Sequence, residues 1–240
     1  MRSTIFQRAV VIIWLCLSTI RVSAQEQLPE YLYEFGGMVG GSFYMGDANR
    51  NRILYKMNPA AGAVFRYNIN FRYALKANLA WARVSGSTEG LENVFPDNGQ
   101  VTFERNVIDL GGQVEFNFFP YSDQYQYMYT KRISPFIAGG FGFSASPGGG
   151  NMFFSPHLSL GTGVKYKLKN RINLGAEWTV RKLFSDALDV DGSNELLNDP
   201  YGIGSGWLKN RDLYSMLTIS VTYDFGLRNC NCNRKDMKVK

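Results

Sequence analysis

LYSMLTISVTYDF, residues 213–225, is the stretch that decides the fold. From Leu217 to Phe225 every second residue is apolar or aromatic, and the residues between them are Thr, Ser, Thr and Asp. Alternation with a period of two predicts a β-strand that has one apolar and one polar face. About ten residues of this kind let a tilted strand cross a bilayer, and a terminal aromatic suits the membrane interface. The stretch therefore predicts one strand of a transmembrane β-barrel.

Seven earlier segments carry similar alternation, which gives eight strands in all. These segments are 33–44, 61–68, 73–82, 107–118, 134–143, 157–167 and 172–181. The segment 134–143 has the weakest pattern, because its second face contains Phe136 and Ala138 in place of polar residues. A soluble β-sandwich shares the alternation, but it rarely places aromatics so regularly at both strand ends. No segment after residue 24 has eighteen consecutive apolar residues, so a membrane-spanning helix is not expected.

The connections between these segments fall into two alternating groups. One group contains 68–72, 119–133 and 167–171; the other contains 45–60, 84–101, 144–156 and 182–212, which are rich in Gly, Asn, Asp and Ser. Short periplasmic turns and long outer loops are typical of outer-membrane barrels. We therefore expect an all-β fold: an eight-stranded antiparallel transmembrane β-barrel of the outer-membrane type, in contact with outer-membrane lipid, with both termini periplasmic. The connection 119–133 is long and tyrosine-rich, which suggests a contact surface.

Residues 1–24 have the pattern of a cleaved signal peptide. Arg2 and Arg8 precede an apolar core over 9–20, and small residues at 22–24 form the expected cleavage site. We expect residues 25–225 to form the barrel and residues 226–240 a basic periplasmic tail. The signal contains three of the 26 Lys and Arg residues and no acid, which leaves 23 basic against 20 acidic residues. This near balance gives no indication of nucleic-acid binding.

Charged residues occupy the polar faces of the predicted strands and are expected in the barrel interior. They are Glu34, Arg66, Lys76, Asp109, Glu115, Lys165, Glu177, Arg181 and Asp224. Both signs are present, which predicts a paired network that fills the interior, since eight strands enclose little more than side chains. Aromatics predict a periplasmic girdle of Tyr67, Tyr73, Phe116, Phe118, Tyr166, Tyr223 and Phe225, and an outer girdle of Phe43, Trp81, Phe141, Phe143 and Phe153.

His157 is the only histidine, so no histidine-rich metal site and no cofactor are expected. His157 and Ser159 share one strand face, with Glu177 on the next predicted strand. This His-x-Ser pair resembles that of the outer-membrane lipid A deacylases, which are eight-stranded barrels, although the flanking residues differ. A nucleophile and base also need a group that orients the base. We expect a structural histidine and no enzymatic activity, with a lipid A-modifying enzyme as the alternative.

The tail contains Cys230 and Cys232, separated by one residue. In an exported protein such cysteines are expected to be oxidised or paired. A bond between them would close a small strained ring, and disulfides to a partner or a soft-metal site are alternatives. A tail disulfide without function remains an equal alternative to a docking element. The residues we assign to partner binding, as a hypothesis, are Arg228, Cys230, Cys232, Arg234, Lys235 and Lys238.

Three segments carry a family resemblance. EFGGMVGGSFYMGD (34–47), GAVFRYNIN (62–70) and ALKANL (74–79) resemble the PorG family, small outer-membrane barrels of the type IX secretion system. The likeness extends over about residues 31–225, and GGSFYMGD is its most specific part. It implies a non-enzymatic role in protein secretion, and in gliding motility in some bacteria, as the membrane anchor of a periplasmic ring of PorK and PorN beneath the translocon. A structural or adhesion barrel is a further alternative.

Overall fold

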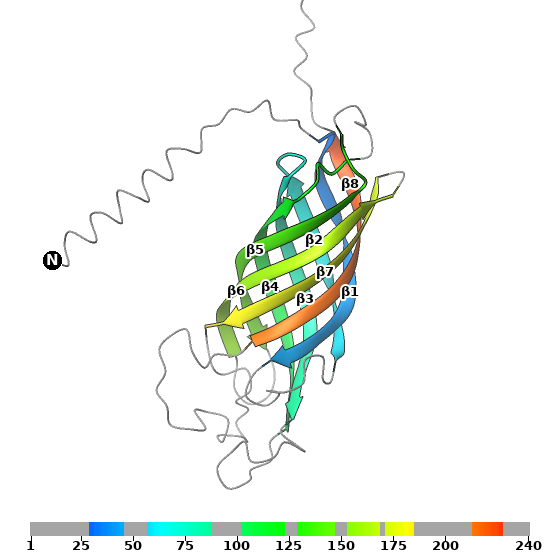
Figure 1. Cartoon of the computed structure of the whole chain (residues 1–240). Helices are drawn as coiled ribbons and strands as arrows, with labels where there is room; N and C mark the ends of the chain where they lie inside the picture. The colour runs from blue at the N-terminus through cyan, green and yellow to red at the C-terminus, as the bar shows by residue number, and fades with distance from the viewer. Residues whose placement is uncertain are drawn as a thin grey trace, which may run out of the picture.

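The computed structural model describes residues 29–45, 57–87, 102–122, 129–146, 153–168, 171–184 and 213–227. They form a closed barrel of antiparallel strands in chain order, and β8 pairs with β1 to complete the ring (Figure 1). The strands are β1 (Tyr31–Met45), β2 (Asn58–Asn68), β3 (Tyr73–Ser87), β4 (Thr102–Asn117), β5 (Ile133–Ser146), β6 (Phe153–Lys167), β7 (Ile172–Leu183) and β8 (Leu213–Leu227). No helix in these ranges is long and apolar enough to cross a membrane.

The two ends of the barrel differ in their connections. At the turn end, which is uppermost in Figure 1, β1 begins opposite the end of β8, and Tyr31 pairs with Leu227. Connections 69–72, 118–132 and 168–171 lie at this end. The loop end carries connections 46–57, 88–101, 147–152 and 184–212, most of whose residues lie outside the described ranges. The predicted alternation of the connections between two ends is confirmed.

Burial along each strand has the opposite sense to that of a soluble protein. In β8 the outward residues from Leu217 to Phe225 are 39% to 61% exposed, whereas the inward residues from Thr218 to Asp224 are at most 7% exposed. The other strands repeat this sense of burial, with exposed apolar side chains outside, while the buried set contains most of the polar and charged residues together with apolar ones such as Met38 and Val64. Apolar outer walls suit hydrocarbon, and closure gives every strand a hydrogen-bonding partner on both sides. The predicted eight-stranded barrel of the outer-membrane type is therefore confirmed.

Several strands extend further toward the loop end than the alternation predicted. β3 and β4 continue together to the pair Ser87 and Thr102, and β6 starts at Phe153. In this extension Arg83 and Glu104 face outward and form an exposed ion pair. The apolar alternation stops where the barrel leaves the apolar belt, but the backbone ladder does not need it and continues.

The aromatic girdle of the turn end is confirmed, since its seven residues are all exposed or half-exposed, with ring contacts such as Tyr73 to Phe116 at 5.1 Å. The predicted loop-end girdle is wrong at Phe43, and the side chain of Phe153 lies outside the described part of the structure. Phe43 is 1% exposed, and its β8 partner Ser215 is also buried, so this outward position is covered. Phe154 is exposed on the outer face and stacks on Phe143, with ring centroids 5.5 Å apart.

The weak pattern of β5 has a packing explanation. Phe136 and Ala138 are buried inside the barrel, and the Nζ of Lys165 lies 4.9 Å from the Phe136 ring centroid. A Cβ atom on Gly163, the β6 partner of Phe136, would lie 2.8 Å from this ring. The glycine thus leaves space for an aromatic ring that lies against the ammonium group of a buried lysine.

Candidate functional site at the turn end of the barrel

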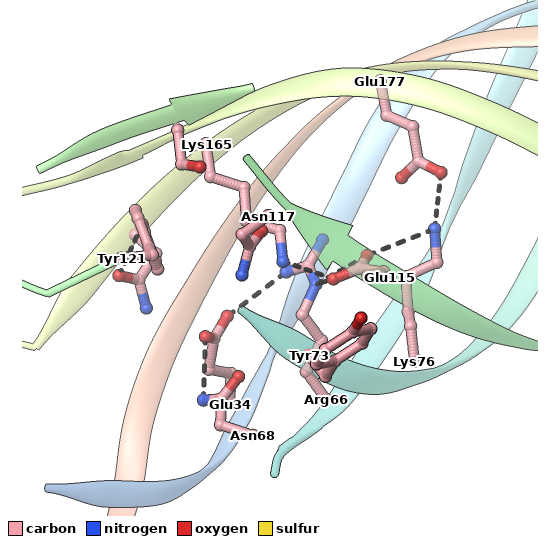
Figure 2. A network of polar contacts seen from close by, with 12 residues as sticks. Glu34, Arg66, Asn68, Tyr73, Lys76, Glu115, Asn117, Tyr121, Lys165 and Glu177 are labelled. Atoms are coloured by element: carbon pink, nitrogen blue, oxygen red, sulfur yellow. Dashed lines mark hydrogen bonds and ion pairs between the residues drawn. The ribbon is translucent and has the colours of Figure 1, made fainter. Parts of the chain in front are cut away.

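Six inward charges from six strands meet in the turn-end half of the interior (Figure 2). The period-two alternation of each strand directs them inward, and barrel closure brings distant strands into contact. Three are acids and three are bases, so the set is balanced. Its members are Glu34 (β1), Arg66 (β2), Lys76 (β3), Glu115 (β4), Lys165 (β6) and Glu177 (β7). We call these six residues the charge network.

Glu115 is the centre of the charge network. Arg66 Nε donates to both carboxylate oxygens at 3.1 Å, and Lys165 Nζ donates to Oε2. Lys76 Nζ lies 3.6 Å from Glu115 Oε1 and donates to Glu177 Oε1 at 2.5 Å. Arg66 Nη1 also reaches Glu34 Oε2 at 3.3 Å. Buried charges persist only when they are paired in this way, so the predicted paired network is confirmed.

A second cluster lies nearer the loop end, around Asp109. Arg181 Nε donates to Asp109 Oδ1 at 3.1 Å, and the hydroxyl of Tyr214 donates to Oδ2 at 2.7 Å. Ser144 Oγ lies 3.0 Å from His157 Nδ1, and His157 Nε2 lies 3.4 Å from Asp109 Oδ2. The negative charge of Asp109 is balanced by the positive charge of Arg181. His157 would add a further positive charge only if it were protonated.

The structure does not bring together the predicted pair of His157 and Ser159. Ser159 instead accepts a hydrogen bond from Gln113 Nε2 at 2.9 Å, and Glu177 belongs to the charge network. The histidine instead contacts Ser144. Ser144 was not predicted as a site residue, because the predicted strand ended at residue 143 and β5 continues to Ser146. Its even number, shared with the inward residues Phe136 and Ala138, could have indicated that it points into the barrel. His157, Ser144 and Asp109 are all fully buried, so the cluster forms part of the packed interior of the barrel.

Residues 118–122 and 129–132, the described parts of the connection between β4 and β5, lie at the mouth of the barrel at the turn end, and we call them the closing connection. Tyr121 N donates to Phe71 O at 3.1 Å, and Ser122 N donates to Lys131 O at 3.2 Å. The Tyr121 hydroxyl donates to Asn173 Oδ1 at 3.0 Å inside the barrel, and the side chains of Tyr121 and Ser122 are buried. These residues therefore cover part of the mouth, while the charge network fills the interior beneath it.

Beside this closure lies a pocket at the rim of the mouth. It is lined by the start of β1, the 69–72 turn, the end of β4, the closing connection and Lys167 of β6. Lys167 Nζ is 2.6 Å from Asp224 Oδ2, and Asn173 Nδ2 donates to Asp224 Oδ1 at 2.6 Å. Glu34, at the floor of the pocket, accepts from Asn68 Nδ2 at 3.0 Å. Asp224 and Glu34 thus have partners.

The outer rim of the turn end is basic. Its exposed cations are Arg72, Lys131, Arg132 and Arg171. Arg72 Nη1 donates to Phe118 O at 2.9 Å, and Arg171 lies 4.7 Å from the ring centroid of Tyr31. Tyr129, at 87% exposure, projects from the closing connection. The rim therefore presents positive charge and an exposed aromatic side chain.

The predicted partner-binding residues of the tail lie outside the described residues, as does the predicted signal peptide over 1–24. These tail residues are Arg228, Cys230, Cys232, Arg234, Lys235 and Lys238. Within the described ranges, no group of three or more His, Cys, Asp and Glu side chains is placed to hold a metal ion. The role of the tail in partner binding therefore stays a hypothesis.

The fold and the filled interior define a class: a small, plugged, eight-stranded barrel of the outer-membrane type. The chain belongs to the family described as a domain of unknown function (DUF6089), which matches residues 7–146 and 154–234. None of the curated proteins compared with the chain matches it.

Solved barrels with similar folds share little sequence with the chain. Neisserial surface protein A (NspA) is 12% identical with a TM-score of 0.46, and the match covers 80% of this chain and 97% of that one. Ail, the attachment invasion locus protein of Yersinia pestis, was solved with the heparin analogue sucrose octasulfate. It is 11% identical with a TM-score of 0.44, and the match covers 81% of this chain and 99% of that one. The outer membrane protein OprG from Pseudomonas aeruginosa is 10% identical with a TM-score of 0.44, and the match covers 83% of this chain and 98% of that one.

Proposed function

We propose that this barrel is the outer-membrane component of a type IX secretion system that anchors the periplasmic PorK and PorN ring. The proposal rests on the sequence resemblance of segments 34–47, 62–70 and 74–79 to the PorG family. The structural observation that carries it is the turn end, where the closing connection covers part of the mouth of a barrel whose interior is already filled. Such a barrel is suited to anchoring a partner and has no described path for transport.

The anchor proposal requires the turn end to face the periplasm, with both termini on that side. The short turns 69–72 and 168–171 support this orientation, because outer-membrane barrels keep short turns in the periplasm. The ring would then meet the basic rim, the exposed Tyr129 and the tail after Leu227. Aromatic and arginine side chains are the residue types that most often dominate binding energy at interfaces.

The hydrogen bonds of the described turn-end residues also favour a docking role. The closing connection is held by a backbone hydrogen bond, from Tyr121 N to Phe71 O, and by the buried Tyr121 hydroxyl. A partner that binds the rim therefore meets a largely preformed surface, and less ordering entropy opposes binding. The translocon is a further partner in this proposal, since the ring lies beneath it.

Mild periplasmic crosslinking, followed by affinity capture and mass spectrometry, tests the anchor. Four forms are compared: the full chain, a chain ending at Leu227, the double variant Lys131→Glu and Arg132→Glu, and the control variant Arg83→Gln at the opposite end. The full chain and the control are expected to recover PorK and PorN, while truncation or rim charge reversal reduces recovery several-fold.

Recovery of no secretion component from the full chain would refute the anchor role. The alternatives then make distinct predictions in the same cells. A lipid A-modifying enzyme predicts altered lipid A mass after His157→Ala, and an adhesion barrel predicts that only loop-end changes alter the phenotype. Equal ring recovery from all four forms would move the contact away from the tail and the rim.

A further inference from the structure

The pocket at the mouth of the barrel is rich in hydrogen-bond acceptors and aromatic rings. Glu30, Glu34 and Asn117 supply side-chain oxygens, and the rings of Tyr31 and Tyr121 form part of its wall. Cations already lie against both of these rings: Arg171 on Tyr31 and Lys167 on Tyr121, at 4.7 and 5.1 Å from the ring centroids. A pocket with this lining attracts positive charge.

Two buried oxygens in this pocket have no hydrogen-bond partner among the described residues. They are Oε2 of Glu30 and Oδ1 of Asn117. Asn117 is 3% exposed, and its Nδ2 donates to Phe71 O at 3.4 Å, which fixes the amide orientation and leaves Oδ1 as the free acceptor. An unpaired buried acceptor is costly, so both oxygens require a donor from outside the described residues.

The cations next to the pocket are engaged elsewhere. Lys167 pairs with Asp224 at 2.6 Å, and Arg66 pairs with Glu34 and Glu115 at 3.3 and 3.1 Å. Among the side chains that line the pocket, Glu30 therefore has a carboxylate oxygen, Oε2, with no hydrogen-bond partner among the described residues. A donor that carries positive charge, a primary ammonium or a guanidinium, complements a carboxylate oxygen more strongly than a neutral donor does.

We propose that the pocket binds a lysine or arginine side chain, and that the occupant comes from the chain's own basic tail. Leu227 pairs with Tyr31, which lines the pocket, so the tail begins beside it. The tail carries Arg228, Arg234, Lys235, Lys238 and Lys240. A short tether supplies these groups at an effective concentration on the order of millimolar, which suffices for a weak site.

This inference does not depend on the secretion role, because it concerns contacts within one chain. The two roles are linked in one respect: if a ring protein bound the tail, the tail side chain would leave the pocket. The two proposals remain separable, because the purified barrel alone, without ring proteins, tests this one.

The test uses the purified barrel in detergent, labelled with ¹⁵N-asparagine, and follows the side-chain amide of Asn117 by NMR. Three chains are compared: the full chain, the chain ending at Leu227, and a full-length chain with the five tail cations changed to Gln. The amide signals of the second and third are expected to coincide and to differ from those of the first. Signals that are identical in all three would overturn occupancy by the tail.

A probe then tests the chemistry of the pocket in the chain ending at Leu227. Nα-acetyl-lysine methylamide is expected to move the Asn117 signals back toward the full-chain positions at millimolar concentration. The uncharged isostere Nα-acetyl-norleucine methylamide is expected to leave them in place. Glu30→Gln should weaken lysine binding about tenfold or more, because it removes the charge from the hydrogen bond, while the loop-end control Glu104→Gln leaves it unchanged.

Equal shifts from the lysine and norleucine probes, or none from either, would overturn the cation site. Heat-dependent migration on SDS gels confirms that each variant is folded. Glu30 precedes β1 and is half-buried at the rim, so the isosteric Gln should not disturb strand pairing.

Discussion

Replacing Glu115 by Gln removes the central acid of the charge network while nearly keeping its shape. Arg66 retains Glu34 at 3.3 Å and Lys76 retains Glu177 at 2.5 Å, but Lys165 loses the acid it contacts. Breaking a buried ion pair by removing one partner typically costs about 3–5 kcal/mol, because a buried charge is left uncompensated. We therefore expect Glu115→Gln to lower the free energy of unfolding by about this amount.

The control for this variant is Glu104→Gln on the outer face. Glu104 pairs with Arg83, and both side chains are about half exposed, so loss of this pair should cost less than about 1 kcal/mol. The double variant Glu115→Gln and Lys165→Met removes the orphaned cation together with the acid. It should recover part of the lost stability, because the interior is again balanced in charge.

The assay is reversible urea unfolding in phospholipid vesicles, followed by tryptophan fluorescence and by heat-dependent migration on SDS gels. A loss for Glu115→Gln no larger than that for Glu104→Gln would refute the network as a stabilising element. A double variant as unstable as the Glu115→Gln single variant would show that the uncompensated Lys165 is not the cause.

Three further predictions concern the wall, the packing and the closing connection. Ile219→Arg places a charge in the middle of the apolar belt and should cost about 2–4 kcal/mol in vesicle unfolding, whereas an equal stability would place this face away from lipid. Gly163→Ala puts a Cβ too close to the backbone oxygen of Ala176 and 2.8 Å from the ring of Phe136 and should cost about 1–3 kcal/mol by the same assay; no loss would mean that the backbone of β7 and the ring both adjust without cost. Tyr121→Phe removes the hydroxyl that donates to Asn173 and should lower the free energy of unfolding by about 0.5–1.5 kcal/mol. Proteolysis of the closing connection should also become faster, and an unchanged cleavage rate would show that this hydrogen bond does not hold the connection in place.

Much of the barrel could be predicted from the sequence because its signals are local. The alternation in β8 and the parity of Glu34, Arg66 and Glu115 depend only on the period of two along one strand. Since this period places successive side chains on opposite faces, each strand with one polar face indicates which of its charges lie inside. The inward direction of all nine predicted charges is confirmed by their burial.

The contacts of the candidate site could not be predicted in the same way. His157 and Ser159 share one face of one strand, yet the histidine contacts Ser144 on β5, because cross-strand register decides which hydroxyl faces the ring. Similarly, nothing in segment 119–133 indicates that Tyr121 inserts into the mouth, since its partners Phe71 and Asn173 lie on other connections and strands.

The sequence by itself therefore determines where the strands lie, how many there are and which side chains point inward. These properties depend only on the alternation of neighbouring residues along the chain. Closure of β1 on β8, the choice of Arg66, Lys76 and Lys165 as partners of Glu115, and the pocket at the mouth follow only from the folded barrel. The physical reason is that strands in a barrel are tilted and staggered, so residues from distant segments reach the same height in the interior. That stagger is set by the hydrogen-bond register of the whole ring, which no single segment contains.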